Sequence, residues 1–118
     1  MKFLLIPLLL LLSTHPNIDT TLIRYGDISN FSSERNDKVA VINSKNVYRK
    51  LPSYMAIEKE GAKKGSARYH ELMKKATKNF KRVLRLVAVE KKLVLIVEQG
   101  GVVDYKSEDA TNACISKI

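Results

Sequence analysis

The chain has 118 residues and a formal net charge of +9, from 21 lysines and arginines against 12 aspartates and glutamates. This length is enough for one small domain with a thin core. A single cysteine, Cys114, excludes an internal disulfide and any site built from paired cysteines, and we expect it to be a small buried apolar residue.

The first fifteen residues are predicted to be an export segment and not part of the fold. Lys2 is followed by ten apolar residues, 3–12, which is the layout of a secretory signal. A helix needs about 20 apolar residues to cross a bilayer comfortably, so this run is short for a stable anchor. Residues 1–15 are therefore interpreted as a cleaved signal peptide, with a short retained membrane anchor and a buried core segment as alternatives.

Residues 16–37 are predicted to be a flexible connector that leads into a domain at 38–118. They contain Pro16, Gly26 and several asparagines and aspartates, and they end in a polar run at 32–37. Such residues favour turns and loops over regular elements. The apolar residues of this stretch are too isolated to indicate a helix or a strand.

The domain is predicted to begin with a strand and a short helix. Residues 39–42 are apolar and mostly β-branched, which is typical of a buried strand. Ser44 follows, and its hydroxyl can cap a helix over residues 45–51.

A helical arm is predicted to extend over residues 45–91. Pro52 interrupts its first helix, because proline lacks the backbone N–H that a helix interior needs, and a second helical piece is expected at 54–59. Gly61 and Gly65 then indicate the turn of the arm.

The second helix of the arm, predicted over residues 66–91, carries the longest periodic pattern in the chain. Six apolar residues are separated by four, three, four, three and four positions, which is the spacing of a heptad seam. They are Tyr69, Met73, Ala76, Phe80, Val83 and Val87. We expect this seam to pack against residues 45–59 as a helical hairpin, with association between two chains, and hence a homo-oligomer, as the alternative.

The positive charge of the chain is concentrated in this arm. Residues 44–92 contain 15 lysines and arginines against four acidic residues. Such a charged surface is usually only solvated. The alternative is a basic projection that binds an anionic membrane surface, an acidic peptide or nucleic acid, of which the export segment argues against nucleic acid. The candidate partner-binding residues are Lys63, Lys64, Lys74, Lys75, Lys78, Lys81, Arg82 and Arg85.

Two further strands and a last helix are predicted after the arm. Residues 93–97 are continuously apolar, which indicates a strand buried on both faces. The glycine pair at 100–101 favours a tight turn into a second strand of a hairpin at 102–105, and a helix is expected over 110–118. The predicted fold is therefore α+β, a small three-stranded sheet with a short projecting helical hairpin and a C-terminal helix.

The sequence contains no pattern that indicates catalysis or a bound cofactor. His70 and Glu71 are not followed by the second histidine of a zinc-protease helix, and there is no glycine-rich phosphate loop and no cysteine pair. We therefore expect no catalytic, cofactor-binding or metal-binding residues, and a protein that is not an enzyme.

Short motifs at both ends of the domain resemble a known protein family. The motifs at the start are KVAVIN at residues 38–43 and VYRKL at 47–51. Those at the end are LVLIV at 93–97, VV at 102–103 and DAT at 109–111. Together they resemble the opening and closing parts of the OmpH/Skp periplasmic chaperones, with alanine in the last motif where that family usually has isoleucine. The arm is shorter here than the long helical tentacles of that family.

A second family has the same frame with a short arm. FKRVL at residues 80–84 matches a Phe-x-x-Ala/Val-Leu step in the second helix of the TrbI family of F-type conjugative transfer systems. This chain is similar to that family in size and in the order of its blocks, although the TrbI membrane segment is a longer anchor. The resemblance to the two families covers residues 38–118 and carries no catalytic residues.

The two resemblances imply two different functions. TrbI implies a non-enzymatic accessory component of an F-type conjugative type IV secretion system, on the periplasmic side of the inner membrane, that influences pilus assembly or retraction. OmpH/Skp implies a short periplasmic holdase chaperone for outer-membrane proteins. The expected partners are proteins of a secretion or transfer machine, or unfolded outer-membrane proteins. A retained segment 1–15 would tether the domain to the inner membrane, and a cleaved one would free it in the periplasm.

Overall fold

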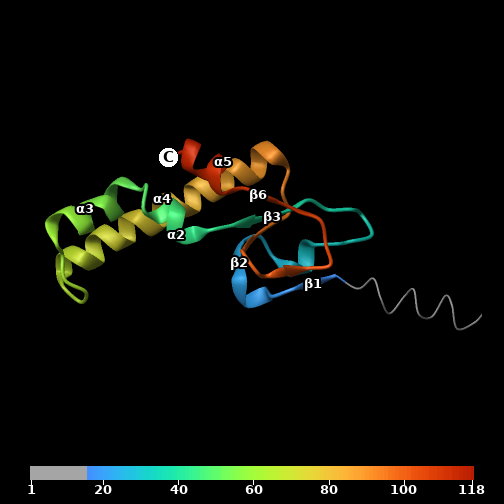
Figure 1. Cartoon of the computed structure of the whole chain (residues 1–118), viewed down its shortest axis with the longest axis horizontal. Helices are drawn as coiled ribbons and strands as arrows, with labels where there is room; N and C mark the ends of the chain where they lie inside the picture. Colours follow the sequence, from blue (N-terminus) through green and yellow to red (C-terminus); the bar gives the residue numbers. More distant parts are fainter. Residues whose placement is uncertain (1–15) are drawn as a thin grey trace, which may run out of the picture.

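Residues 16–118 are described by a computed structural model and form an α+β fold, as the sequence predicts (Figure 1). They contain a four-stranded sheet, a two-stranded sheet, four α-helices and two 3-10 helices. Within this part of the chain, no helix is both long enough and apolar enough to span a bilayer. The predicted export segment at 1–15 lies outside the described residues.

The main sheet has four strands, of which the sequence predicted only two, at residues 39–42 and 93–97. They are β2 (Ile23–Tyr25), β3 (Val39–Ile42), β4 (Leu95–Glu98) and β6 (Ser107–Asp109). The strand order is β2-β4-β3-β6, in which β3 is parallel to both β4 and β6, and β2 is antiparallel to β4. The prediction of three strands was wrong because both edge strands are only three residues long and carry no clear periodic pattern.

The two central strands are buried on both faces, as predicted for residues 93–97. The face that we call the helix side carries Ala40, Ile42 and Ile96. The face that we call the N-terminal side carries Val39, Leu95 and Val97. All six side chains are nearly or fully buried, so each face of the sheet has a cover of its own.

Three helices connect β3 to β4, and a fourth lies near the end of the chain. They are α2 (Ser44–Tyr48), α3 (Pro52–Glu60), α4 (Ala67–Lys91) and α5 (Thr111–Ser116). Asn43, and not Ser44, caps α2, because its side chain accepts a hydrogen bond from the Asn46 N–H at 3.2 Å. Pro52 is the first residue of α3, where a helix needs no N–H donor. Gly61, with a φ of 66°, ends α3 at the predicted turn.

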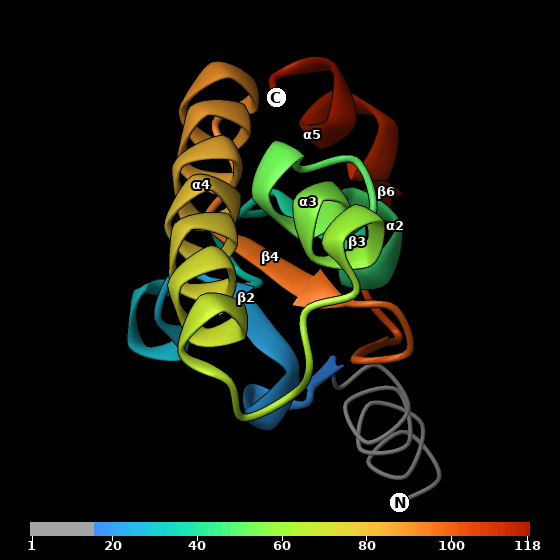
Figure 2. The same ribbon diagram turned by 90° about the vertical axis from the view of Figure 1, so that its left-hand side faces the viewer.

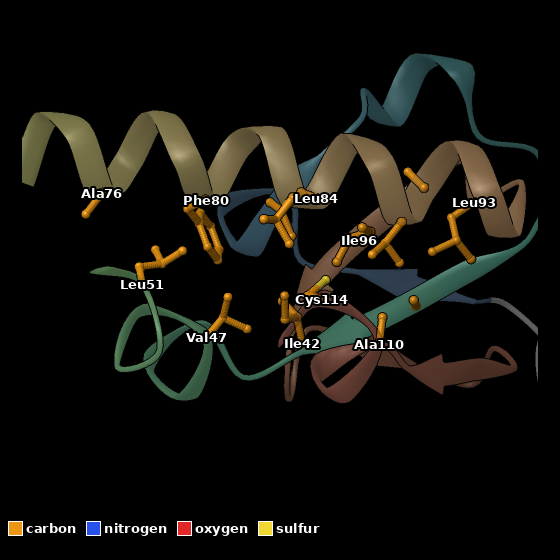
Figure 3. Close-up of a cluster of buried hydrophobic side chains, with 14 residues drawn as sticks. Ile42, Val47, Leu51, Ala76, Phe80, Leu84, Leu93, Ile96, Ala110 and Cys114 are labelled. Atoms are coloured by element: carbon orange, nitrogen blue, oxygen red, sulfur yellow. The ribbon is translucent and has the colours of Figure 1, made fainter. Parts of the chain in front are cut away.

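The helix side of the sheet carries the main core of the molecule. α4 lies along this side, with α2 and α5 beside it (Figure 2). Figure 3 shows Phe80 and Leu84 pointing from α4 toward Val47 and Ile42. Cys114 is fully buried in the same core, which confirms its prediction as a small buried residue. Burial, helped by a nearby carboxylate, raises the pKa of its thiol to about 11.

The segment 16–37, predicted to be a flexible connector, is instead built into the fold. It contains β1 (Asn17–Ile18), the 3-10 helices η1 (Thr20–Leu22) and η2 (Ile28–Asn30), and β2. β1 pairs with β5 (Val102–Val103), so the expected hairpin of the last two strands was wrong as well. Apolar residues of the segment cover the N-terminal side of the sheet, namely Ile18, Leu22, Ile23 and Phe31. A strand that is apolar on both faces needs this second cover.

Two glycines let the chain lie close against the sheet. Gly26 has a φ of 92°, and a Cβ atom there would lie 2.2 Å from the Val94 carbonyl oxygen. At Gly101 a Cβ atom would lie 2.5 Å from Val97 Cγ1. Both distances are too short for a side chain, so this close approach requires glycine at both positions.

Polar contacts also join the N-terminal segment to the rest of the domain. Glu98 accepts hydrogen bonds from Arg24 Nε at 3.1 Å, from the Ser44 N–H at 3.0 Å and from the Ser44 hydroxyl. Burial acts to raise the pKa of Glu98, but the hydrogen bonds from Ser44 and Arg24 outweigh it and hold the pKa below its usual value. The Tyr105 hydroxyl donates to the Asp37 carbonyl oxygen and secures the end of the segment.

Candidate binding face on helix α4

The sequence explains why α4 is long. The Ser66 hydroxyl caps it by accepting a hydrogen bond from the Tyr69 N–H at 3.1 Å. Its 25 residues are mostly strong helix formers such as alanine, leucine, lysine and arginine. Lys92 ends it in the left-handed region with a φ of 57°. The structure thus confirms the helix predicted over residues 66–91.

One face of α4 is buried, and it is wider than the predicted seam. The seam residues that are buried are Ala76, Phe80, Val83 and Val87. Tyr69 and Met73, near the start of the helix, are partly exposed. Buried residues that the seam did not include are Leu72, Leu84 and Ala88. The predicted seam was too narrow, because a helix in a globular core buries a broader stripe than a coiled coil does.

The buried face of α4 packs within the same chain. It contacts α3 along the arm and the sheet in the body of the domain. The Tyr48 ring stacks on Phe80 with 4.6 Å between ring centroids, and the Tyr48 hydroxyl donates to Thr77 Oγ1 at 3.2 Å. The predicted helical hairpin is therefore what the structure shows, and Phe80 lies where the arm meets the body.

Opposite the buried face, α4 carries a row of cations that we call the basic face. It consists of Lys74, Lys75, Lys78, Lys81, Arg82 and Arg85, all of them exposed. At 3.6 residues per turn, these residues fall within an arc of about 120° and span about 17 Å along the helix axis. Six of the eight predicted partner-binding residues therefore share one side of one helix.

The other two, Lys63 and Lys64, lie apart from the basic face. They are exposed in the turn between α3 and α4, at the opposite end of the domain from β1 (Figure 1). Arg68 holds this turn, because it donates to both carboxylate oxygens of Glu60 at 2.8 Å and to Glu71 at 3.1 Å. The hydrogen bonds from Arg68 hold the pKa of Glu60 below its usual value. The two lysines extend the positive charge to the tip of the arm.

Little of the charge on the basic face is neutralised by the described part of the chain. Lys75 forms an ion pair with Glu71 at 3.5 Å, and Arg82 donates to Asn79 Oδ1 at 2.7 Å. Within residues 16–118, no ion pair is formed by Lys74, Lys78, Lys81 or Arg85. Like charges three and four positions apart repel one another and destabilise a helix. Anionic groups that approach this row relieve the repulsion and stabilise the helix.

Two shallow hollows follow the basic face. Lys78 and Lys81 line both of them, and their volumes are about 540 and 500 Å³. The other residues that line them are Lys75, Asn79, Arg82 and Arg85 in the first, and His70, Met73, Lys74 and Thr77 in the second. Cationic walls of this kind suit carboxylates or other anionic groups of a partner, and the lining residues include no acid, base and nucleophile in a catalytic arrangement.

Two apolar residues continue the basic face toward the C-terminus, and sequence reasoning missed them. Leu86 and Val89 are 40% and 69% exposed. Together with Lys75, Asn79 and Arg82 they are spaced by four, three, four and three positions. A search for a second stripe with the same spacing, about 120° around the helix from the first, would have named them as candidates.

Within residues 16–118, no group of three or more histidine, cysteine, aspartate or glutamate side chains is placed to hold a metal ion. No protein-family model matches the chain, and neither the curated proteins nor the solved structures gave a match.

Proposed function

We propose that this chain is a non-enzymatic binding protein that attaches to an acidic surface of a partner protein through the basic face of α4. The observation that carries the proposal is the placement of six exposed cations on the side opposite the core. A row of one sign steers an oppositely charged partner and fixes its orientation. A solvated helix surface is more stable with mixed charges than with charges of one sign, because opposite charges attract one another at i, i+4 spacing.

In this proposal the protein is an accessory component of an F-type conjugative type IV secretion system, placed on the periplasmic side of the inner membrane. The support is the resemblance of residues 38–118 to the TrbI family and the shortness of the arm. The basic face docks onto a neighbouring protein of the transfer machine, and through that contact the protein influences pilus assembly or retraction.

The alternative is a short holdase of the OmpH/Skp type, and two observations weigh against it. A holdase offers apolar surface to unfolded clients, whereas Phe80 and the other apolar residues around it on α4 are buried within the chain. α4 is about 37 Å long at 1.5 Å per residue, and its second half, from Phe80 onward, packs in the body of the domain. Only about half of that length projects as an arm, which is little to enclose a client.

A photo-crosslinking amino acid in place of Lys78 tests which protein meets the basic face. In cells that carry the transfer system, we expect adducts with one of its proteins, identified by mass spectrometry. The matched control has the same group in place of Lys45, which is exposed on α2, and should give no such adduct. Adducts with outer-membrane barrels would favour the holdase, and identical adducts from both positions would contradict the proposal.

Charge reversal measures the same contact in a second way. Lys78→Glu combined with Lys81→Glu should preserve the fold and weaken binding of the crosslinked partner about tenfold or more, since exposed charge pairs contribute up to about 1 kcal/mol each. Lys45→Glu combined with Lys50→Glu changes the net charge equally at exposed positions elsewhere, and should have little effect. Binding that is insensitive to both pairs and to salt would retire the basic face as the binding site.

A further inference from the structure

The outer side of α4 offers more than charge. Leu86 and Val89 continue the line of Lys75, Asn79 and Arg82 along one edge of the basic face; four of the five are exposed, and Asn79 is half-buried. Val89 is the most exposed large apolar side chain of residues 16–118. The stripe is therefore cationic and polar over its first turns and apolar at its end, along a length of about 21 Å.

We propose that the basic face docks an acidic amphipathic α-helix of the partner protein. Carboxylates of that helix lie against Lys75, Lys78 and Arg82, and its apolar side chains pack on Leu86 and Val89. This inference rests on the proposed function, because it uses the same face of α4. It adds the structural class of the partner and the direction in which the partner lies.

The spacing of the stripe is what selects a helix. Residues that alternate four and three positions apart lie along one line of a helix surface, and two helices that meet along such lines pack at a small crossing angle. A partner of about four turns matches the length of the stripe. Its two ends differ in chemistry, because the Lys75 end is charged and the Val89 end is apolar. Only one orientation of the partner helix along α4 places its carboxylates at the charged end and its apolar side chains at the apolar end.

The buried face of α4 argues against a membrane as the occupant. A helix that lies on a bilayer surface inserts a continuous apolar face between the lipids. The continuous apolar face of α4, with Phe80, Leu84 and Val87, is buried in the core. The outward side has only Leu86 and Val89, which suit the narrow contact line of a partner helix. A nucleic acid would use the cations, but the basic face has no aromatic ring on which a base could stack.

Binding of synthetic peptides, followed by fluorescence anisotropy, tests the inference. The first probe is a capped, helix-forming peptide of about four turns, with glutamates at i, i+4 and i+7 and leucines in one end turn. The second has glutamines in place of the leucines and the same charge. The leucine peptide should bind at least about fivefold more tightly, since one buried methylene alone changes an affinity about fourfold.

Two variants show whether that preference comes from the proposed contact. Leu86→Gln combined with Val89→Gln should abolish the preference and leave the affinity for the glutamine peptide unchanged. Met55→Gln is the matched control, because Met55 is also an apolar residue on a helix, 48% exposed on α3, and its replacement should leave the preference intact. Circular dichroism checks that all variants keep their helix content.

The outcomes separate this inference from the proposed function. If both peptides bind equally, or neither binds, while a group at position 78 still crosslinks to a transfer protein, the partner helix is wrong and the binding function stands. If the crosslinks are missing as well, both fail. The protein could instead bind vesicles of phosphatidylethanolamine and phosphatidylglycerol more tightly than the leucine peptide, and lose that binding in the Leu86→Gln, Val89→Gln variant. That result would contradict the partner helix and identify a membrane surface as the occupant.

Discussion

The two sides of the main sheet are covered in different ways, although the sheet is apolar on both. The helix side belongs to a core of fourteen buried residues from helices and strands. The N-terminal side has three buried residues of its own, Val39, Leu95 and Val97, under partly buried side chains. One side is a packed interior, and the other is a thin cover of short strands and 3-10 helices.

This difference shows that two kinds of interaction hold one small sheet together. On the helix side, stability comes from apolar burial, which contributes in proportion to the area removed from water. On the N-terminal side, the close approach at Gly26 and the polar contacts of Glu98 and Tyr105 supplement a smaller apolar contact. Equivalent substitutions should therefore cost more on the helix side.

Replacement of Phe80 by aspartate should have the largest effect. It removes a buried ring that stacks on Tyr48 and puts a carboxylate in its place. Loss of a buried phenylalanine costs about 3–5 kcal/mol, and the unpaired charge adds to this, which approaches the whole stability of a small domain. Circular dichroism should show a largely unfolded chain at room temperature. Unchanged helicity and melting temperature would mean that the buried face of α4 is assigned wrongly.

Two buried leucines compare the sides directly. Leu84 is 1% exposed on the helix side, and Leu95 is 0% exposed on the N-terminal side. Leu84→Ala should lower the free energy of unfolding by about 4 kcal/mol, and Leu95→Ala by about 2–3 kcal/mol. The loss is smaller at position 95 because the thin cover can move in and fill the cavity left by the leucine more easily than packed helices can. Urea unfolding measures both. A greater loss at position 95 would show the N-terminal side to be the tighter one.

Removal of one ring from the thin cover should cost less again. Phe31 is partly buried, and its ring meets that of Tyr105 edge to face at 5.1 Å. Phe31→Ala should therefore cost about 1–2 kcal/mol in thermal unfolding. Ile28→Ala is the control, because Ile28 is 38% exposed in the same segment and should change stability by less than about 0.5 kcal/mol. A loss at Phe31 as large as that at Leu84 would contradict the comparison.

Glu98→Gln should have the smallest effect, and one that depends on pH. The hydrogen bonds from Ser44 and Arg24 hold the pKa of Glu98 low in the folded state. Its stabilisation is therefore present at neutral pH and is lost as the pH falls from the usual glutamate pKa through the lowered one. The replacement should cost about 1 kcal/mol near neutral pH and little in acid. A difference in urea midpoint that stays constant across a pH series would exclude the carboxylate as its source.

The helix side could be predicted in large part because its patterns are local. Residues 39–42 and 66–91 have the composition and the periodicity of a strand and a helix, and Gly61 marks the turn between two helices. The basic face followed from the same helical period. Leu86 and Val89 were missed because apolar residues of a helix are normally assigned to the core. Their spacing makes them candidates for a second stripe, but their exposure is known only from the packed structure.

The N-terminal side could not be predicted because its elements depend on distant partners. β1 is two residues long and is a strand only through its pairing with β5, in which Asn17 lies opposite Val103. The edge strand β6 of the main sheet was missed for the same reason, because its sequence SED is polar and it becomes a strand through its pairing with β3. Continuous apolar character in residues 93–97 did indicate that a second cover was needed. Nothing in residues 16–37 identified that segment as the cover.

The parallel pairing of β3 has a consequence for how the chain folds as it is made. Val39 lies opposite Leu95 on one side and Ser107 on the other, 56 and 68 positions later in the sequence. A chain that emerges N-terminus first therefore presents β3 with both edges unpaired until almost all residues have appeared. The helical hairpin, which forms from local contacts, can fold first and bring β4 back to β3. Chains that stop before residue 95 would display residues 39–42 as an open edge and should aggregate.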